Sequence, residues 1–234
     1  VVLRINSPGG TVAASQEIYE EVLRLTETDK PVIVSMAETA ASGAYYISCA
    51  ADEIYANGGT ITGSIGVILV TPSLEGLFKY IGVDYRVIKS GKWKDMGSFA
   101  REMKPEEREK FFEIIMDMYA QFLAVVKKGR LAQVRKKGLS ETDLEAMARG
   151  QILSATEAEK KGMIDGIATF EAVKRKAWEM AGQTGEPRVS YPRSTFFRQL
   201  MQFVERESSP TGIREAVMDS LKGTRIEYRY VPGI

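Results

Sequence analysis

The sequence of 234 residues contains no histidine. This absence excludes a Ser-His-Asp triad, a Cys-His dyad and any zinc or haem site that depends on an imidazole ligand. The single cysteine, Cys49, excludes an internal disulfide and a multi-cysteine zinc site. Because its neighbours are small and apolar, we expect Cys49 to be a buried packing residue. No metal and no other cofactor is predicted.

Long apolar runs and a charge excess are also missing. The longest apolar run, residues 65–70, is far shorter than the ~20 residues of a membrane-spanning helix. Lys and Arg total 32 and Asp and Glu 31, so the net charge of +1 favours neither nucleic acid nor an anionic membrane surface as a partner. The chain opens on a strand pattern at residues 1–5 without a methionine. We therefore expect a fragment or trimmed chain, with any membrane anchor upstream.

What the sequence does contain is an alternation of strand-like apolar runs with segments of helical periodicity. This pattern is typical of βαβ units and a mostly parallel sheet. We expect a catalytic domain over residues 1–181 and a peripheral C-terminal extension over residues 182–234. The predicted strands are residues 1–5, 31–36, 53–56, 60–70, 85–88, 151–153, 162–165 and 188–191. The predicted helices are residues 12–26, 44–51, 74–81, 106–128, 155–161 and 173–181, a short one capped by Ser140, and two in the extension, beginning at Ser194 and ending at Leu221.

Three glycine-bearing turns stand out, at residues 7–10, at 42–43 and at 62–66, where glycines interrupt the strand predicted over residues 60–70. The carboxyl ends of neighbouring parallel strands converge on one crevice, so we expect the three turns to meet there. Their spacing fits neither a Walker nor a dinucleotide-binding loop. Ser42, between a strand and a helix, is typical either of close packing or of an exposed nucleophile. With no histidine present, the best attested base for such a serine is a lysine.

Four motifs occur along the chain: NSPGG at residues 6–10, ASGAYY at 41–46, TGSIGV at 62–67 and SGKWKD at 90–95. With these motifs in this order, the chain resembles the bacterial signal-peptide peptidase A family of Ser-Lys proteases over residues 1–175. The family implies the Clp protease/crotonase fold, an α/β fold of repeated ββα units with a mostly parallel sheet. It also implies a homo-oligomeric ring and an extracytoplasmic catalytic domain anchored to the cell membrane.

The resemblance also implies a role for each motif. Ser42 would be the nucleophile, Lys94 the general base, and Ser64 the residue that orients the lysine amine. The backbone N–H groups of Gly10 and Gly43 would form the oxyanion hole, where a side chain at position 10 would intrude on the developing oxyanion.

The expected substrates are hydrophobic remnants of signal peptides with small or apolar residues at P1 and P3. An extended peptide is expected to add to the edge of the glycine-rich strand over residues 60–67 by main-chain hydrogen bonds. The residues expected to contact it are Gly9, Thr62, Gly63, Ile65 and Gly66.

A lysine base has to lose its proton to act. An exposed lysine has a pKa of about 10.4, so about one in 2,500 is uncharged at pH 7, which corresponds to about 4.6 kcal/mol. Burial lowers the pKa of a lysine. We therefore expect Lys94 to be largely buried and Lys92 to be exposed. Asp95 should point away from Lys94, toward arginine or backbone partners.

Two other functions fit part of the pattern. A crotonase-type acyl-CoA enzyme uses backbone N–H groups to hold a thioester enolate and does not need the pair Ser42 and Lys94. A catalytically idle scaffold would keep the fold for assembly alone. Loss of activity on Ser42→Ala without CoA binding excludes the first, and labelling of Ser42 that depends on Lys94 excludes the second.

Overall fold

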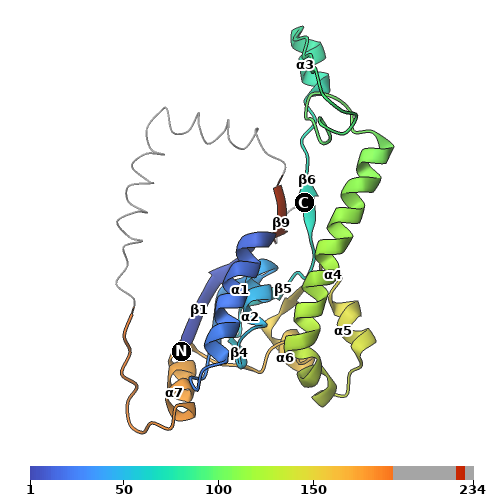
Figure 1. Ribbon diagram of the computed structural model, residues 1–234. Helices are drawn as coiled ribbons and strands as arrows, with labels where there is room; N and C mark the ends of the chain where they lie inside the picture. The colour runs from blue at the N-terminus through green and yellow to red at the C-terminus, as the bar shows by residue number, and fades with distance from the viewer. Residues whose placement is uncertain (192–224, 230–234) are drawn as a thin grey trace. The chain divides into compact units, whose positions relative to one another are not determined.

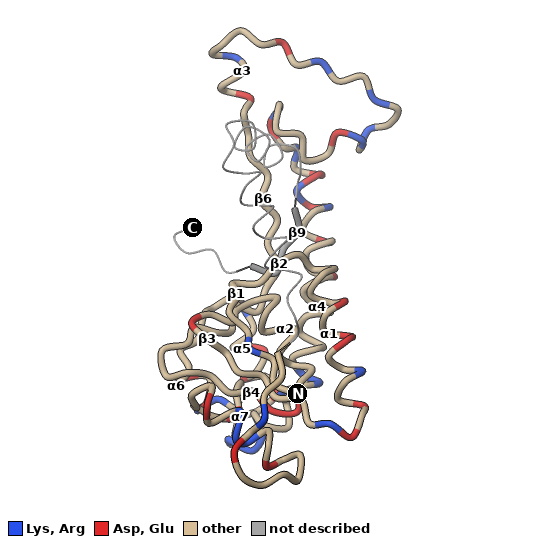
Figure 2. Tube along the Cα trace, turned by 90° about the vertical axis from the view of Figure 1, so that its left-hand side faces the viewer, with Lys and Arg blue, Asp and Glu red and all other residues tan. Residues whose placement is uncertain are grey.

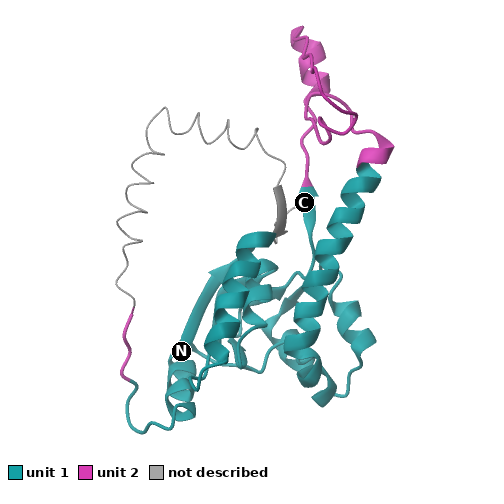
Figure 3. Ribbon diagram, viewed as in Figure 1, with its two compact units in different colours: residues 1–69, 108–187, 226–234 teal, residues 70–107, 188–225 magenta. Residues whose placement is uncertain are grey.

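The computed structural model describes residues 1–191 and 225–229 (Figure 1). The chain divides into two compact units, coloured separately in Figure 3. The first comprises residues 1–69, 108–187 and 226–234, and the second residues 70–107 and 188–225. The predicted boundary between residues 181 and 182 is a different division and stays a prediction.

The element order alternates strands and helices through the first unit, as the sequence pattern predicts. The strands are β1 (Val2–Ser7), β2 (Gly9–Thr11), β3 (Ile33–Ala41), β4 (Glu53–Ala56), β5 (Ile61–Gly63), β6 (Ile68–Val70), β7 (Ile152–Ser154), β8 (Gly166–Ile167) and β9 (Arg225–Arg229). The helices are α1 (Val12–Thr26), α2 (Gly43–Ser48), α3 (Glu75–Ile81), α4 (Pro105–Lys136), α5 (Glu141–Met147), α6 (Ala155–Lys160) and α7 (Phe170–Met180).

The central strand of the main sheet is β3, which pairs in parallel with β1, β4 and β5. β8 continues the sheet in parallel beside β4, and β7 closes the other side antiparallel to β5. The first four residues of β3 are all buried, as expected for a parallel strand covered on both faces. The mostly parallel sheet with its helices confirms the predicted α/β fold of the Clp/crotonase kind.

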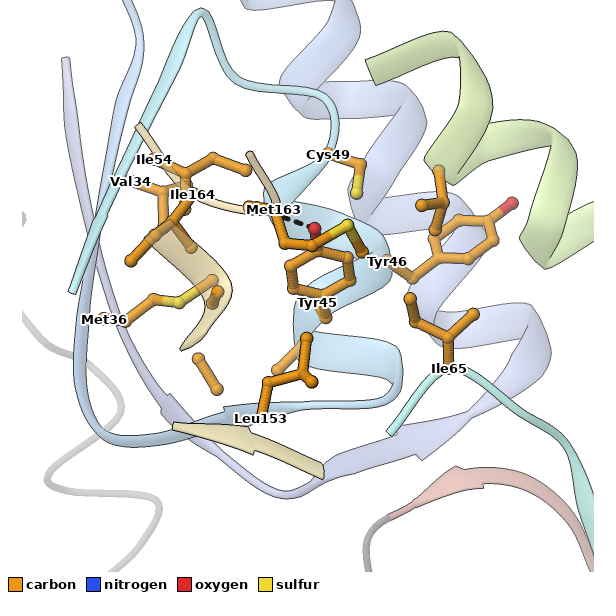
Figure 4. Close-up of a cluster of buried hydrophobic side chains, with 14 of the residues drawn as sticks. Val34, Met36, Tyr45, Tyr46, Cys49, Ile54, Ile65, Leu153, Met163 and Ile164 are labelled. Atoms are coloured by element: carbon orange, nitrogen blue, oxygen red, sulfur yellow. Dashed lines mark hydrogen bonds between the residues drawn. The ribbon is translucent and has the colours of Figure 1, made fainter. Parts of the chain in front are cut away.

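The hydrophobic core lies where α2 packs on β3 and on α1. Tyr45 of α2 is fully buried and its hydroxyl donates a hydrogen bond of 2.7 Å to the carbonyl oxygen of Met163 (Figure 4). The ring of Tyr46 packs edge-on between Tyr19 of α1 and Phe122 of α4, with centroid distances of 5.1 Å to each. Tyr45 and Tyr46, which follow Ser42 in α2, are therefore both part of the core.

The long helix α4 runs eight residues beyond the predicted end at Lys128. The prediction ended the helix before Gly129. In the structure Gly129 does not end the helix; its lack of a side chain lets α4 pack closely against the end of α2. A Cβ atom on Gly129 would overlap the carbonyl oxygen of Cys49 at the end of α2. The following turn buries Arg130, and Val134 lies in the core one turn later. The helix is followed by Gly138, which has a φ of 79°.

Several predicted strands are wrong or shorter than expected. Residues 60–70 form two strands, because Gly63 and Ser64 adopt positive φ angles of 77° and 52° and turn the chain between them. Residues 85–88 and 188–191 form no strand, since no neighbouring segment pairs with them. Residues 162–165 form a turn that leads into β8. The two helices predicted in the C-terminal extension lie outside the described residues.

The second unit differs from the first in having almost no interior. Among its described residues, Glu107 is the one buried side chain. Many of its large apolar side chains are exposed: Val70, Leu77, Tyr80, Ile81, Val83, Tyr85, Val87, Ile88, Trp93, Val189 and Tyr191.

The distribution of charged side chains and the length of the apolar helices are those expected from the composition. Lys and Arg alternate with Asp and Glu along the described chain instead of gathering by sign (Figure 2). Within the described ranges, no helix has the length and apolar character needed to cross a membrane.

Candidate active site

Ser42 stands at the junction between β3 and α2 in a backbone conformation that is unusual for serine. Its φ of 55° and ψ of −119° lie outside the regions that residues with a side chain prefer. Such a conformation costs on the order of 1–3 kcal/mol and persists only where the surrounding structure enforces it. Of the non-glycine residues in the described part of the chain, Ser42 and Ser64 alone have positive φ. A strained strand-to-helix turn of this kind presents a nucleophile in many hydrolases.

The Ser42 hydroxyl is also unusual in its environment. The residue is completely buried, and its Oγ atom has no hydrogen-bond partner among the described residues. No other buried side-chain nitrogen or oxygen in the described residues lacks a partner. Leaving a buried polar group unpaired costs about 1–3 kcal/mol, so packing alone gives no reason for a serine here. Backbone strain and the unpaired hydroxyl are two independent observations, and both select Ser42.

Ser64 lies beside Ser42 at the end of the neighbouring strand. Ala41 of β3 pairs with Gly63 of β5, and the Ser42 N–H donates a hydrogen bond of 2.8 Å to the Gly63 carbonyl oxygen. The Ser64 N–H in turn donates to the carbonyl oxygen of Gln151 at 2.8 Å. Ser64 is 7% exposed. The structure thus brings together the two serines that the motifs single out.

The first glycine turn reaches the same edge of the sheet. Ser7 at the end of β1 pairs with Ala40, two residues before Ser42. Gly9 has a φ of 116°, which turns the chain out of β1 into β2, and β2 contacts α2. The expected meeting of the three turns is therefore confirmed.

The two glycines predicted to form an oxyanion hole lie at this meeting point. Gly43 is the first residue of α2, where N–H groups have no partner inside the helix. A Cβ atom on Gly10 would meet open space within the chain, so no neighbour in the protein requires a glycine there. A role for either N–H in stabilising an oxyanion stays a prediction.

The predicted peptide-binding edge along residues 60–67 is wrong for its first half. β5 is paired on both sides, with β3 and with β7, and offers no free edge. The sequence did not reveal this pairing because β7 lies about ninety residues further along the chain. β2 is an end strand of a separate three-stranded sheet, where it pairs antiparallel with β9, with Gly10 opposite Tyr228. β9 pairs on its other side with β6.

The remaining residues predicted to contact substrate are placed differently from one another. Gly9 and Gly66 are partly exposed, whereas Thr62 and Ile65 are buried. The Thr62 hydroxyl donates a hydrogen bond of 2.7 Å to the Ala40 carbonyl oxygen, and Ile65 belongs to the core. Neither residue is accessible to a peptide in this structure. Gly63 is buried as well, and a Cβ atom added to it would lie 3.2 Å from both the Gln151 carbonyl oxygen and the Leu153 side chain.

Lys94 belongs to the second unit, whereas Ser42 belongs to the first. The expectation that Lys94 is largely buried is wrong within this chain: Lys94 is exposed, and so is Lys92. The physical reason is that the second unit has almost no interior in which an amine could be removed from water. The exposure of Lys92 was predicted and is confirmed.

Ion pairing distinguishes Lys94 from the other lysines of its loop. Lys89 pairs with Asp95 at 2.5 Å and Lys92 with Glu106 at 2.5 Å. The Lys94 amine has no hydrogen bond or ion pair to any described residue. Lys94 is therefore the one lysine of this loop whose amine is available to a reacting group.

Asp95 points away from Lys94, as predicted. Its carboxylate accepts hydrogen bonds from Arg101 at 3.0 Å and from Lys89 at 2.5 Å. The guanidinium of Arg101 and the amine of Lys89 together hold the pKa of the Asp95 carboxyl well below its usual range.

Sequence reasoning missed a buried polar network that anchors α2. Arg130 is 1% exposed and donates to the Gly162 carbonyl oxygen through Nε at 3.1 Å and Nη2 at 2.8 Å. It also pairs with Asp165 at 2.8 Å, and Asp165 accepts a hydrogen bond from the Ile54 N–H. Met163, between these residues, accepts the hydrogen bond of Tyr45. The only signal in the sequence was the extension of the family resemblance through residues 128–130 and 165–166.

The remaining nucleophile candidate in this region is Cys49, which the structure excludes. Cys49 is 5% exposed within the core, as predicted. Burial raises the pKa of its thiol to about 12, which keeps it protonated and unreactive near neutral pH. Burial likewise raises the pKa of Tyr45 well above its usual value. Over the described residues, no three acidic or cysteine side chains gather in a group that could hold a metal ion.

Comparison with known proteins finds similarity to peptidases. The model of peptidase family S49 matches residues 24–184. A candidate protease of Synechocystis is 42% identical over 182 residues, which are 78% of this chain and 63% of that protein. Protease 4 of Haemophilus influenzae is 38% identical over 183 residues, 78% of this chain and 28% of that protein.

A third relative comes from a plant. The chloroplastic serine protease SPPA of Arabidopsis thaliana is 37% identical over 167 residues, 71% of this chain and 24% of that protein. The chain thus spans between 24% and 63% of the lengths of these three relatives.

Proposed function

The chain belongs to peptidase family S49, and from this premise we propose that it is a serine endopeptidase that cleaves peptides through an acyl-enzyme on Ser42. Lys94 is the general base in this proposal and Ser64 orients its amine. The supporting observation is the state of Ser42 itself: a strained, buried serine whose hydroxyl has no partner in the part of the chain that the structure describes.

The reaction follows from these assignments. The Lys94 amine accepts the proton of the Ser42 hydroxyl while Oγ attacks the scissile carbonyl carbon. The N–H groups of Gly10 and Gly43 stabilise the negative charge on the carbonyl oxygen. The peptide C–N bond then breaks, and the leaving amine takes up the proton from the lysine. Water attacks the resulting ester, again with Lys94 as base, and releases the second product and the free serine.

Peptide recognition by main-chain hydrogen bonds fits this site. β2 carries Gly9 and Gly10 and already pairs antiparallel with an extended segment of the same chain. Strand addition of this type tolerates many sequences and leaves selectivity to side-chain pockets. We therefore propose unfolded hydrophobic peptides, such as remnants of signal peptides, as the substrates.

Assembly and location are part of the same proposal. The exposed apolar side chains of the second unit, including Tyr80, Ile81 and Ile88, need a covering surface. We propose a homo-oligomeric ring, which would also shield the peptidase site from folded proteins. The proposed location is the cell membrane, with the catalytic domain on the extracytoplasmic side.

The test is hydrolysis of a fluorogenic hydrophobic peptide by the wild type, Ser42→Ala and Lys94→Ala across a pH series. The proposal expects both variants to be inactive and wild-type activity to rise with pH as the base loses its proton. Activity of Ser42→Ala, or acyl-CoA binding with turnover that does not need Ser42, would favour the crotonase-type alternative. A wild type that neither hydrolyses peptides nor reacts at Ser42 would favour an idle scaffold.

A further inference from the structure

The loop that carries Lys94 is built from local turns. The N–H groups of Lys94, Met96 and Ser98 each donate to the carbonyl oxygen three residues earlier, at 3.2, 3.1 and 3.1 Å. Turns of this kind shape a loop but do not fix its direction, and the second unit has almost no core to hold it. The rings of Phe78 and Tyr85, before the loop, cluster with the ring of Phe99, which follows it. A separate set of hydrogen bonds holds Asp95, the residue that follows Lys94.

Arg101 donates these hydrogen bonds. We propose that Arg101 is a positioning residue for the catalytic lysine: its guanidinium clamps Asp95, the neighbour of Lys94, to Glu107 in the first turn of α4. The inference rests on the proposed role of Lys94 as general base. It adds a residue that touches neither the substrate nor the reacting atoms and acts through Lys94.

The guanidinium uses all five of its N–H donors. Toward the loop, Nε donates to the Asp95 carboxylate and Nη2 to the Asp95 carbonyl oxygen, both at 3.0 Å. Toward α4, Nη1 and Nη2 donate to the two oxygens of Glu107 at 2.9 and 2.5 Å. The fifth bond goes from Nη1 to the Glu102 carbonyl oxygen at 2.9 Å. Arg101 therefore holds both the side chain and the backbone of the residue after Lys94.

The burial of the two carboxylates separates this cluster from an ordinary surface ion pair. The side chain of Asp95 is 9% exposed and that of Glu107 is 2% exposed. The Glu107 carboxylate also accepts a hydrogen bond of 3.1 Å from the Lys104 N–H, which fixes it against the start of the helix. Glu107, the single buried side chain in the described part of the second unit, is thus the residue to which Arg101 ties Asp95.

The planar fork of arginine is essential to this arrangement. Lysine carries the same charge but has only three donors, all on one nitrogen, so it cannot replace the five hydrogen bonds that the fork makes to Asp95, Glu102 and Glu107. Arg101→Lys therefore keeps the charge and removes the geometry. Arg86 supplies a matched control, because it pairs with Asp84 in the same unit with both side chains largely exposed.

The experiment measures kcat and KM for peptide hydrolysis by the wild type, Arg101→Lys and Arg86→Lys. A misplacement of about 1 Å costs about a hundredfold in rate, so Arg101→Lys should lower kcat by about tenfold to a hundredfold. KM should stay within about twofold, because the proposed peptide site lies on β2 in the other unit, and Arg86→Lys should match the wild type. Unchanged kcat in Arg101→Lys, or an equal loss in Arg86→Lys, would overturn the proposal.

A double-mutant cycle separates positioning from a general structural effect. The rate at which an acylating probe labels Ser42 is measured in Lys94→Ala with and without Arg101→Lys. If Arg101 acts through Lys94, the second change alters the residual rate by less than about twofold. The same loss in both backgrounds would show an effect independent of Lys94 and contradict the clamp.

The outcomes also distinguish failure of the clamp from failure of the proposed function. If Lys94→Ala retains full activity, the proposed general base is wrong, and the clamp falls with it. If Lys94→Ala is inactive while Arg101→Lys is fully active, only the clamp is wrong. If Arg101→Lys fails to fold, Glu107→Gln is the second variant, because glutamine keeps one acceptor oxygen for Arg101. Glu107→Gln is expected to lower kcat by about threefold to tenfold. A wild-type kcat in Glu107→Gln would overturn the clamp.

Discussion

The Ser42 N–H donates a hydrogen bond of 2.8 Å to the carbonyl oxygen of Gly63. This bond lies one residue beyond the last strand pair of β3 and β5, Ala41 with Gly63, and carries the sheet register into the turn. It fixes the backbone of the two neighbouring turns in which Ser42 and Ser64 adopt positive φ angles. The strain at the two serines is thus maintained by the main sheet.

Replacing the proposed nucleophile should stabilise the protein. Ser42→Ala removes a buried hydroxyl that has no partner, so the free energy of unfolding should rise by about 1 kcal/mol. Ser48→Ala is the matched control in the same helix, because the Ser48 hydroxyl donates to the Ala44 carbonyl oxygen at 2.7 Å. It should lower the free energy of unfolding by about 1 kcal/mol. Urea unfolding measures both, and equal losses would contradict this account of Ser42.

The loop lysines should differ sharply in their effect on activity. Lys94→Met removes the proposed base and should lower kcat by about a thousandfold, within the range seen for general-base catalysis. Lys92→Met removes an exposed pair with Glu106 and should change kcat by less than about twofold. Peptide hydrolysis at saturating substrate measures both variants. The assignment fails if the two lose activity to the same extent.

Gly129→Ala should destabilise the first unit. The added Cβ would overlap the Cys49 carbonyl oxygen and push α4 away from α2, at a cost of about 1–3 kcal/mol. A Cβ on Gly58 meets open space, so Gly58→Ala should leave the free energy of unfolding nearly unchanged. Thermal unfolding of the two variants tests the contact, and equal melting temperatures would contradict it.

Cys49 should resist alkylation in the folded protein. With a thiol pKa of about 12, about one molecule in ten thousand carries a thiolate at pH 8, against about one in ten for an exposed thiol of pKa 9.0. The same shift should lower the free energy of unfolding as the pH rises above about 9, because the unfolded chain releases the thiol proton first. Mass spectrometry after iodoacetamide treatment, with and without denaturant, measures the difference. Equal rates would show that Cys49 is accessible.

The sequence predicted best those features that depend on residues close together in the chain. The helix over Val12–Thr26 and the strand over Glu53–Ala56 were predicted to the residue, because local periodicity and turn residues define them. The capping box at Ser140, with Asp143 three residues later, was likewise readable and is present.

The errors involve contacts between residues far apart in the chain. The pairing of β5 with β7 closed an edge that residues 60–67 had suggested was open. Gly129 was taken as the end of a helix, although it marks a close contact with Cys49. The burial of Lys94 was inferred from what its chemistry requires, and the second unit provides no interior for it. Local patterns could not reveal any of these three.

The site itself was predicted in part. The glycine turns and Ser42 were found from local sequence patterns near the carboxyl ends of strands, where parallel strands converge, whereas Ser64 was assigned from the family resemblance. Arg130 and Arg101 were not, since a single arginine in a helix or loop gives no sign of being an anchor. Their importance lies in several partners that only the fold assembles.

The most direct test of the account is to trap the acyl-enzyme. The protein is mixed with a slowly deacylating peptide ester at low pH, and the modified residue is located by mass spectrometry of its fragments. The account predicts one acyl group per chain, attached to Ser42, absent from Ser42→Ala and formed at least about a hundredfold more slowly in Lys94→Ala. Acylation of another residue, or equal acylation of Ser42→Ala, would contradict the assignment of Ser42 as the nucleophile.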